Sequence, residues 1–177
     1  MKPALAYFIT FTTYGTRLHG REEGSVDRQH NAPGTPTLPA NPNREAAERR
    51  AMRQPPYALD AARRAVVLRT VREVCRHRQW ILLAAHVRSD HVHVVVAAPA
   101  VTPEKVMADL KAWASRRLRE ASAEPADRDR WTQHGSTRYC NTPASVEAAI
   151  TYTLDGQGPR MAAHDGRIND TNNESEA

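Results

Sequence analysis

Alternating hydrophobic and polar positions predict four strands along the chain. Residues 4–13, 80–87 and 91–97 are rich in aromatic and β-branched side chains, which favour an extended backbone. Only three residues separate the second segment from the third, so these two strands are expected to form a hairpin. A shorter strand is predicted near residues 137–141.

Apolar residues that recur at helical spacing predict three longer helices between and after these strands. Asp60 and Thr102 are residue types that cap the first turn of a helix, and each precedes one of these segments. A short basic helix is also expected, before the break at Pro55-Pro56. The four helices cover residues 44–53, about residues 60–78, a segment that begins at Pro103, and residues 142 to 156 or 158.

The order of these elements predicts an α+β fold. One strand, a helix, two strands, a helix, a short strand and a last helix fit a ferredoxin-like, or RRM-like, antiparallel sheet with helices packed on it. Residues 1–160 are long enough for a single domain with one core, interrupted by a loop insertion at about residues 15–58. Residues 161–177 are polar and mildly acidic, which predicts a disordered tail.

The positive charge of the chain is almost entirely arginine. The net charge is +5, and lysine occurs only at Lys2, Lys105 and Lys111. Arginine forms bidentate contacts with phosphate and stacks on bases, so the composition favours a nucleic-acid partner. A GC-rich coding sequence would give the same bias, so composition alone leaves both explanations open.

Two cysteines, Cys75 and Cys140, are too few for a disulfide framework or for a zinc site built on cysteine. No apolar stretch approaches the 20 or so residues that a membrane helix needs, so no membrane partner is expected. The first residues read as a strand and lack the features of a secretion signal. We therefore expect a cytoplasmic, reduced protein.

The pair His91 and His93 is a candidate metal site. Side chains alternate along a strand, so both imidazoles project to one side while Val92 points to the other. Neutral imidazole is the commonest metal ligand, and two histidines on a strongly apolar strand are costly without a partner. Asp90 directly precedes the pair and could orient one ring as a hydrogen-bond acceptor. The alternative is a pair of surface histidines on an edge strand.

Tyr152 is a candidate nucleophile on the last predicted helix. It lies beside the apolar stripe of that helix and away from its centre, so its ring can be half buried while its hydroxyl stays accessible. A tyrosine at the boundary of a core produces the same pattern. The stripe consists of Val146, Ala149, Ile150, Thr153 and Leu154.

Three features together resemble a known family. The segment Trp80–Val96 with its His-Val-His motif, the downstream Tyr152, and the opening Phe8–Gly20 are similar to the single-tyrosine HUH transposases. These are the insertion-sequence-200-like enzymes and the REP-associated tyrosine transposases. The similarity covers roughly residues 5–158.

The resemblance implies a metal-dependent enzyme that nicks single-stranded DNA and transfers the strand, with hairpin or repeat DNA as its substrate. It places His91 and His93 on a central strand, with Mg²⁺ or Mn²⁺ between them. Tyr152 would attack a phosphate and form a 5′-phosphotyrosine link. The alternative is a domesticated protein that keeps the transposase fold and binds hairpin DNA without cutting it.

This chain departs from the family pattern at the position of the third metal ligand. The family places a polar residue, Gln or Asn, one helical turn after the tyrosine, and this chain has Gly156 at that position. Gln157 is the preferred third ligand, because Gly156 can end or distort the helix and redirect the next side chain. Asp155 is the alternative, since it lies closer in angle to Tyr152 on an ideal helix.

Single-stranded or hairpin DNA is the partner that the resemblance implies, bound by a monomer or a homodimer. The basic segment 44–53 is one candidate for phosphate contacts, and five single residues named below are others. A solvated charged surface would explain each of these residues equally well. Replication initiators of the superfamily usually have a lysine after the tyrosine, and relaxases would place the nucleophile at Tyr7 or Tyr14; both fit less well. The other candidate contacts are Arg17, Arg21, Lys111, Arg116 and Arg117.

Overall fold

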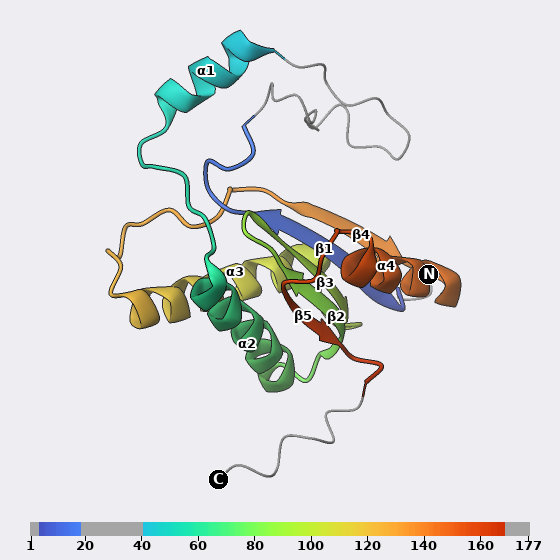
Figure 1. Ribbon diagram of the computed structural model, residues 1–177. Helices are drawn as coiled ribbons and strands as arrows, with labels where there is room; N and C mark the ends of the chain where they lie inside the picture. Colours follow the sequence, from blue (N-terminus) through green and yellow to red (C-terminus); the bar gives the residue numbers. More distant parts are fainter. Residues whose placement is uncertain (1–3, 19–40, 169–177) are drawn as a thin grey trace.

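A computed structural model describes residues 4–18 and 41–168 of the 177-residue chain. Five antiparallel strands form one sheet in the order β4-β1-β3-β2-β5 (Figure 1). The strands are β1 (Ala6–Thr12), β2 (Ile81–Val87), β3 (His91–Ala97), β4 (Ser136–Cys140) and β5 (Ala162–Asp165). The helices are α1 (Pro42–Ala51), α2 (Ala61–His77), α3 (Pro103–Ser122) and α4 (Pro143–Asp155). The order β1-α2-β2-β3-α3-β4 is the ferredoxin-like arrangement, which confirms the predicted fold class.

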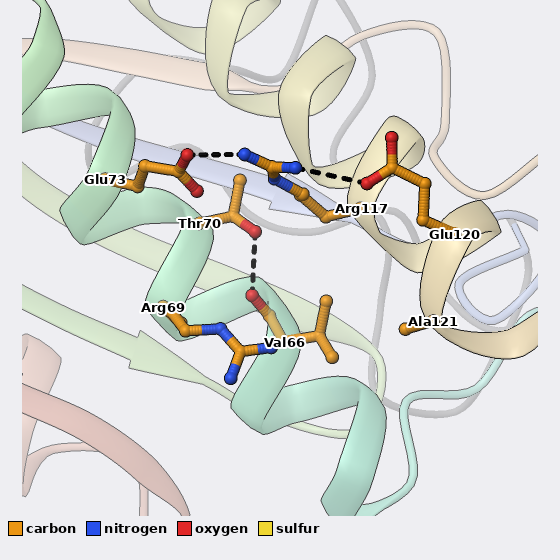
Figure 2. A pocket seen from close by; sticks show the side chains of 7 residues that line it. All are labelled: Val66, Arg69, Thr70, Glu73, Arg117, Glu120 and Ala121. Atoms are coloured by element: carbon orange, nitrogen blue, oxygen red, sulfur yellow. Dashed lines mark hydrogen bonds and ion pairs between the residues drawn. The ribbon is translucent and has the colours of Figure 1, made fainter.

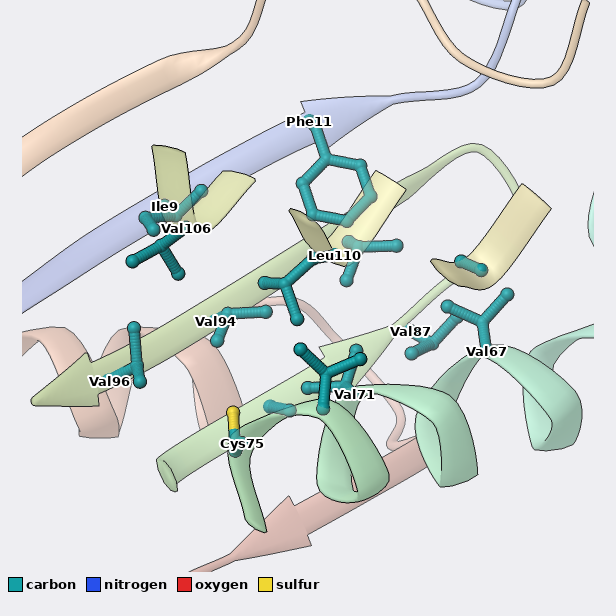
Figure 3. Close-up of a cluster of buried hydrophobic side chains, with 14 of the residues drawn as sticks. Ile9, Phe11, Val67, Val71, Cys75, Val87, Val94, Val96, Val106 and Leu110 are labelled. Carbon is teal, nitrogen blue, oxygen red and sulfur yellow. The ribbon is translucent and has the colours of Figure 1, made fainter. Parts of the chain in front are cut away.

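The two faces of the sheet are covered by different helices. Helices α2 and α3 pack together on one face, and α4 lies on the other (Figure 1). Val94 and Val96 of β3 point into the first layer with Ile9 and Phe11 of β1 (Figure 3). Each fully buried valine stabilises the fold by roughly 1.5–3 kcal/mol. Alternation along β3 then places His91, His93 and Val95 on the face of α4.

Side-chain caps fix where the helices begin. The Asp60 carboxylate accepts a hydrogen bond from the backbone N–H of Arg63, and the Thr102 hydroxyl accepts one from the N–H of Lys105. Thr142 and Ser145 form a reciprocal capping box at the start of α4. Each cap satisfies a backbone donor that the first turn of a helix leaves unpaired. The predicted starts of these helices are confirmed.

Strand β5 corrects the prediction of a tail that is disordered from residue 161. Residues 162–165 pair with β2, from Ala84↔Asp165 to Val87↔Ala162. The strand completes the hydrogen bonds of the β2 edge, which would otherwise be exposed. Its sequence, Ala-Ala-His-Asp, has neither β-branched residues nor alternation, so only tertiary pairing makes it a strand.

Backbone hydrogen bonds hold the segment before α2 beside the residues that follow β1. The N–H of Tyr57 donates to the carbonyl of Tyr14, and the N–H of Tyr14 donates to the carbonyl of Arg130. Gly15 lies beside Met52 with a positive φ of +69°, where a side chain would collide with the Met52 methyl group. The N–H of Thr13 donates to the carbonyl of Asp90, which holds the end of β1 against the start of β3, where the histidine pair lies.

Among the described residues, no helix is both long and apolar enough to cross a membrane. Cys75 and Cys140 are both buried as free thiols.

Candidate functional site

His91 and His93 lie side by side on the central strand of the sheet. Each is only 5% exposed, and their ring centroids are 4.7 Å apart. The sheet order places β3 between β1 and β2, so the pair is not on an edge strand. A buried polar ring needs a partner, and the surrounding residues supply one for each histidine.

Each imidazole is held through its Nδ1 atom. Thr10 Oγ1 lies 2.7 Å from His93 Nδ1, and Asp90 Oδ1 lies 2.5 Å from His91 Nδ1. The hydrogen bond from His91 holds the pKa of Asp90 well below its usual range, so this carboxylate is an acceptor only. His91 therefore donates from Nδ1, and in the neutral form of the ring the Nε2 lone pair can bind a metal ion.

Gln157 closes the site from the end of α4. Its Oε1 atom is 3.4 Å from His91 Nε2, and its side chain also interacts with His93. Gly156 is the C-terminal cap of α4, with its N–H on the carbonyl of Tyr152, so the chain leaves the helix there and turns Gln157 toward the rings. The carboxylate of Asp155 instead pairs with Arg160 at 2.6 Å. The geometry thus brings Gln157, and not Asp155, to the histidines.

Tyr152 stands beside this cluster on α4. Its ring makes edge contacts with His93 at 5.7 Å and with Phe8 at 5.8 Å, both between ring centroids. The residue is 49% exposed, so its ring packs on the site while solvent can reach it. A Cβ at Gly156 would lie 3.0 Å from the Tyr152 ring and 2.8 Å from its carbonyl oxygen. The glycine therefore allows the close approach of the turn to Tyr152.

The donor set fits a divalent cation. Burial, with the neighbouring His91 as a smaller cause, lowers the pKa of His93 to about 3, so this imidazole is neutral at physiological pH. With His91 donating from Nδ1, the acceptors His91 Nε2 and Gln157 Oε1 face each other, an arrangement that a bound cation satisfies. No group of three His, Cys, Asp or Glu residues with metal-binding geometry occurs in the described part of the chain. The third protein ligand would therefore be an amide.

His86 is a residue of the site that the sequence interpretation missed. It is fully buried on β2, directly opposite His93 in the strand pairing. Its Nδ1 donates to the carbonyl of Thr153 at 2.9 Å, and its Nε2 accepts from the N–H of Met161 at 3.0 Å. These two bonds hold both ends of the turn that carries Gln157. The only sequence signal was a histidine in an apolar strand.

Replacing His86 should destabilise the fold. His86→Ala leaves the carbonyl of the buried Thr153 without a partner, which costs about 1–3 kcal/mol, and it also removes the acceptor of the Met161 N–H and opens a cavity in the core. We expect urea denaturation of His86→Ala to show a free energy of unfolding lower by about 2–4 kcal/mol. The free energy of unfolding of His86→Asn should lie between those of the wild type and His86→Ala. Arg76→Gln, at an exposed position of α2, serves as the control and should change it by less than about 0.5 kcal/mol. An equally small effect of His86→Ala would contradict this role.

Of the predicted phosphate contacts, the structure brings one to the histidines. Arg17 Nε is 3.1 Å from the Asp90 carboxylate, and Arg17 Nη2 is 3.1 Å from His91 Nδ1. Arg21 lies outside the described residues. Lys111 donates to the backbone carbonyls of Thr132 at 2.9 Å and His134 at 3.1 Å, so its ammonium group already holds the segment before β4.

Arg116 and Arg117 lie on α3, on the opposite face of the sheet from the histidines. Arg117 forms ion pairs with Glu73 at 2.5 Å and Glu120 at 3.1 Å. It lines a groove of about 440 Å³ between α2 and α3, drawn in Figure 2. The acidic partners neutralise this arginine, and the groove is not continuous with the histidine site.

The basic segment 44–53 forms α1 and the residues just after it. No described residue of α1 is buried. Arg49 pairs with Glu45 at 2.8 Å and Arg44 with Glu48 at 3.9 Å, so two of its arginines are partly neutralised within the helix. The net positive charge of this helix is therefore smaller than its arginine content suggests.

Comparison with known proteins gives a family match. A family model described as "Transposase IS200 like" matches residues 56–151, a range that includes both histidines and ends one residue before Tyr152. No curated protein sequence matches the chain.

Two solved structures are similar to the chain. One is a REP-associated tyrosine transposase bound to a REP hairpin, with a TM-score of 0.45 and 10% identity over 86% of this chain. The alignment spans 66% of that protein, just under two thirds of its length. The other, described as a transposase of Deinococcus radiodurans R1, has a TM-score of 0.45 and 16% identity over 89% of this chain and 93% of its own.

Proposed function

The chain belongs to the IS200-like transposase family, because the family match covers more than half of its length, and we propose that it nicks and rejoins single-stranded DNA in a metal-dependent reaction. The substrate is proposed to be DNA that folds into hairpins or repeats. Tyr152 is the proposed nucleophile, and His91, His93 and Gln157 are the proposed ligands of Mg²⁺ or Mn²⁺.

One observation carries this proposal. Two buried imidazoles and an amide oxygen gather beside a half-exposed tyrosine on one face of the sheet. Three protein ligands leave coordination positions open for a phosphate oxygen, and imidazole and amide bind a cation in their neutral forms, so they do not cancel its charge. When bound, the cation would polarise the phosphate and stabilise the charge that develops on it.

The residues around the ligands would keep them in place. Asp90 and Thr10 bind the Nδ1 atoms and so fix the orientation of both rings. His86 fixes the turn that presents Gln157, and Gly156 lets that turn pass close to Tyr152. Arg17 pairs with Asp90 and adds a positive charge at the edge of the site. From there it can also contact the DNA backbone.

The proposed covalent step is a displacement at phosphorus. The Tyr152 Oη forms a bond to the scissile phosphorus while the bond from phosphorus to the 3′ oxygen breaks. The phenolic proton leaves to solvent, and the departing 3′ oxygen takes up a proton to become a hydroxyl. The 5′-phosphotyrosine retains the energy of the phosphodiester, so attack by a 3′ hydroxyl rejoins the strand and releases the tyrosine without ATP.

The experiment is incubation of the protein and Mn²⁺ with end-labelled single-stranded DNA that forms hairpins. We expect a protein–DNA adduct that survives denaturation, with a free 3′ hydroxyl on the released fragment. Tight hairpin binding with no adduct across a library of such hairpins would contradict the nuclease and favour the noncatalytic hairpin-binding alternative.

Two neighbouring substitutions distinguish the candidate third ligands. Gln157→Ala should weaken Mn²⁺ binding about 10- to 100-fold, because the amide oxygen that faces His91 is lost. Asp155→Ala should leave metal affinity within about twofold, because its carboxylate pairs with Arg160 instead. Calorimetric titration with Mn²⁺ measures both, and the reverse ranking would assign the ligand to Asp155.

A further inference from the structure

Arg138 lies on the same face of the sheet as the histidine pair. It is an exposed residue of β4, opposite Phe8 of β1 in the strand pairing. Its guanidinium carbon lies 5.1 Å from the centre of the Phe8 ring, in cation–π contact. Because side chains of paired residues share a face, Phe8 and Arg138 belong to the layer of α4 and His93.

The Phe8 ring links this arginine to the proposed reaction centre. Phe8 stacks on His93 with centroids 5.5 Å apart and an interplanar angle of 22°. The Tyr152 ring meets Phe8 edge-on, 5.8 Å between centroids. One aromatic ring therefore touches a proposed ligand, the proposed nucleophile and a guanidinium group. Arg138 is held close to the point where the scissile phosphate would lie.

The other arginines around the site already have partners within the fold. Arg17 pairs with Asp90, Arg160 pairs with Asp155, and Arg88 donates to the carbonyl of Pro159. Arg138 differs from Arg17 and Arg160 in having no acidic partner among residues 4–18 and 41–168, where it contacts the Phe8 ring and hydrogen-bonds to the Cys140 thiol. The contact with the Phe8 ring holds the guanidinium on this face of the sheet, and a guanidinium has five N–H donors, more than the Cys140 thiol can use, so N–H groups are left for another acceptor.

We propose that Arg138 binds a backbone phosphate of the DNA strand next to the scissile phosphate. This inference rests on the proposed function, since it places the DNA strand across the α4 face. Phe8 positions the guanidinium, and the planar fork donates to two phosphate oxygens at once. The contact would fix the register of the strand relative to Tyr152 and supplies no base recognition.

The test is a double-mutant cycle between the arginine and single phosphates. The DNA is a hairpin with a single-stranded flank in which one phosphate at a time, on either side of the cut, is replaced by a neutral methylphosphonate. Arg138→Gln should weaken hairpin binding about 10-fold or more and lower the dependence of log K on log salt by about one unit. At one flanking position, the methylphosphonate should weaken wild-type binding similarly yet add little to Arg138→Gln.

The controls separate this contact from a structural role. Arg138→Lys keeps the charge but loses the planar fork, so it should recover only part of the affinity. Arg76→Gln, an exposed arginine on α2, should bind every methylphosphonate DNA as the wild type does. Thermal unfolding of Arg138→Gln should match that of the wild type, because the side chain is exposed.

The cycle uses equilibrium binding, so it gives a result whether or not the protein cuts DNA. Binding without an adduct overturns the proposed nuclease, while the coupling still decides the role of Arg138. Effects of Arg138→Gln and methylphosphonate that add at every position overturn the phosphate contact. Failure of the wild-type protein to bind any hairpin overturns both.

Discussion

Tyr152→Phe should abolish the covalent protein–DNA adduct while the protein still folds and binds hairpin DNA. The substitution removes one oxygen, and the ring contacts with Phe8 and His93 can remain. Because a phenyl ring has no nucleophile, adduct formation should fall about 10³-fold or more. The measurement is the yield of denaturation-resistant adduct over time, with Mn²⁺ and labelled DNA.

Tyr139→Phe is the matched control. Tyr139 is 52% exposed, close to the 49% of Tyr152, but its ring packs on Tyr7, whose side chain belongs to the layer of α2 and α3. We expect this variant to form adduct at nearly the wild-type rate. Retention of the adduct by Tyr152→Phe would show that another group attacks the phosphate.

The second large effect should follow from replacing both histidines of β3. The double variant His91→Ala, His93→Ala removes two of the three proposed ligands, so Mn²⁺ binding should fall more than about 10²-fold and adduct formation about 10³-fold or more. Affinity for hairpin DNA measured without metal should stay within a few-fold. Mn²⁺ should raise the melting temperature of the wild type, because a ligand stabilises the state that binds it, and leave that of the double variant unchanged.

Milder variants test the same site through the partners of the rings. Asp90→Ala and Thr10→Val remove the oxygen atoms that bind His91 Nδ1 and His93 Nδ1. Each should weaken Mn²⁺ affinity about 10- to 100-fold.

Full Mn²⁺ affinity in the double histidine variant would place the metal elsewhere. Loss of DNA binding by a folded double variant would make the histidines DNA contacts.

The features that the sequence predicted well depend on local rules. Alternation along residues 91–97 placed both histidines on one face, and Asp60, Thr102 and Thr142 marked helix starts through hydrogen bonds within one turn. The glycine after α4 was expected to redirect Gln157, and the chain does leave the helix there.

The features that it did not predict depend on pairing between distant segments. Residues 162–165 become a strand only because β2 offers an unpaired edge. His86 acquires its role from the carbonyl of Thr153 and the N–H of Met161, more than 60 residues away. Arg138 reaches the site through the register of β4 with β1, which no spacing along the chain reveals. The structural role of Lys111 also depends on distant residues, since its ammonium group donates to backbone carbonyls about 20 residues further along the chain.

The most direct test of the central claim is to locate the DNA on the protein by peptide mass spectrometry. After reaction with hairpin DNA and Mn²⁺, nuclease and trypsin digestion should leave one modified peptide, Tyr139–Arg160, which contains two tyrosines. Fragmentation of that peptide should place the nucleotide phosphate on Tyr152. A phosphate on Tyr139, or on the N-terminal peptide that carries Tyr7 and Tyr14, would contradict the account.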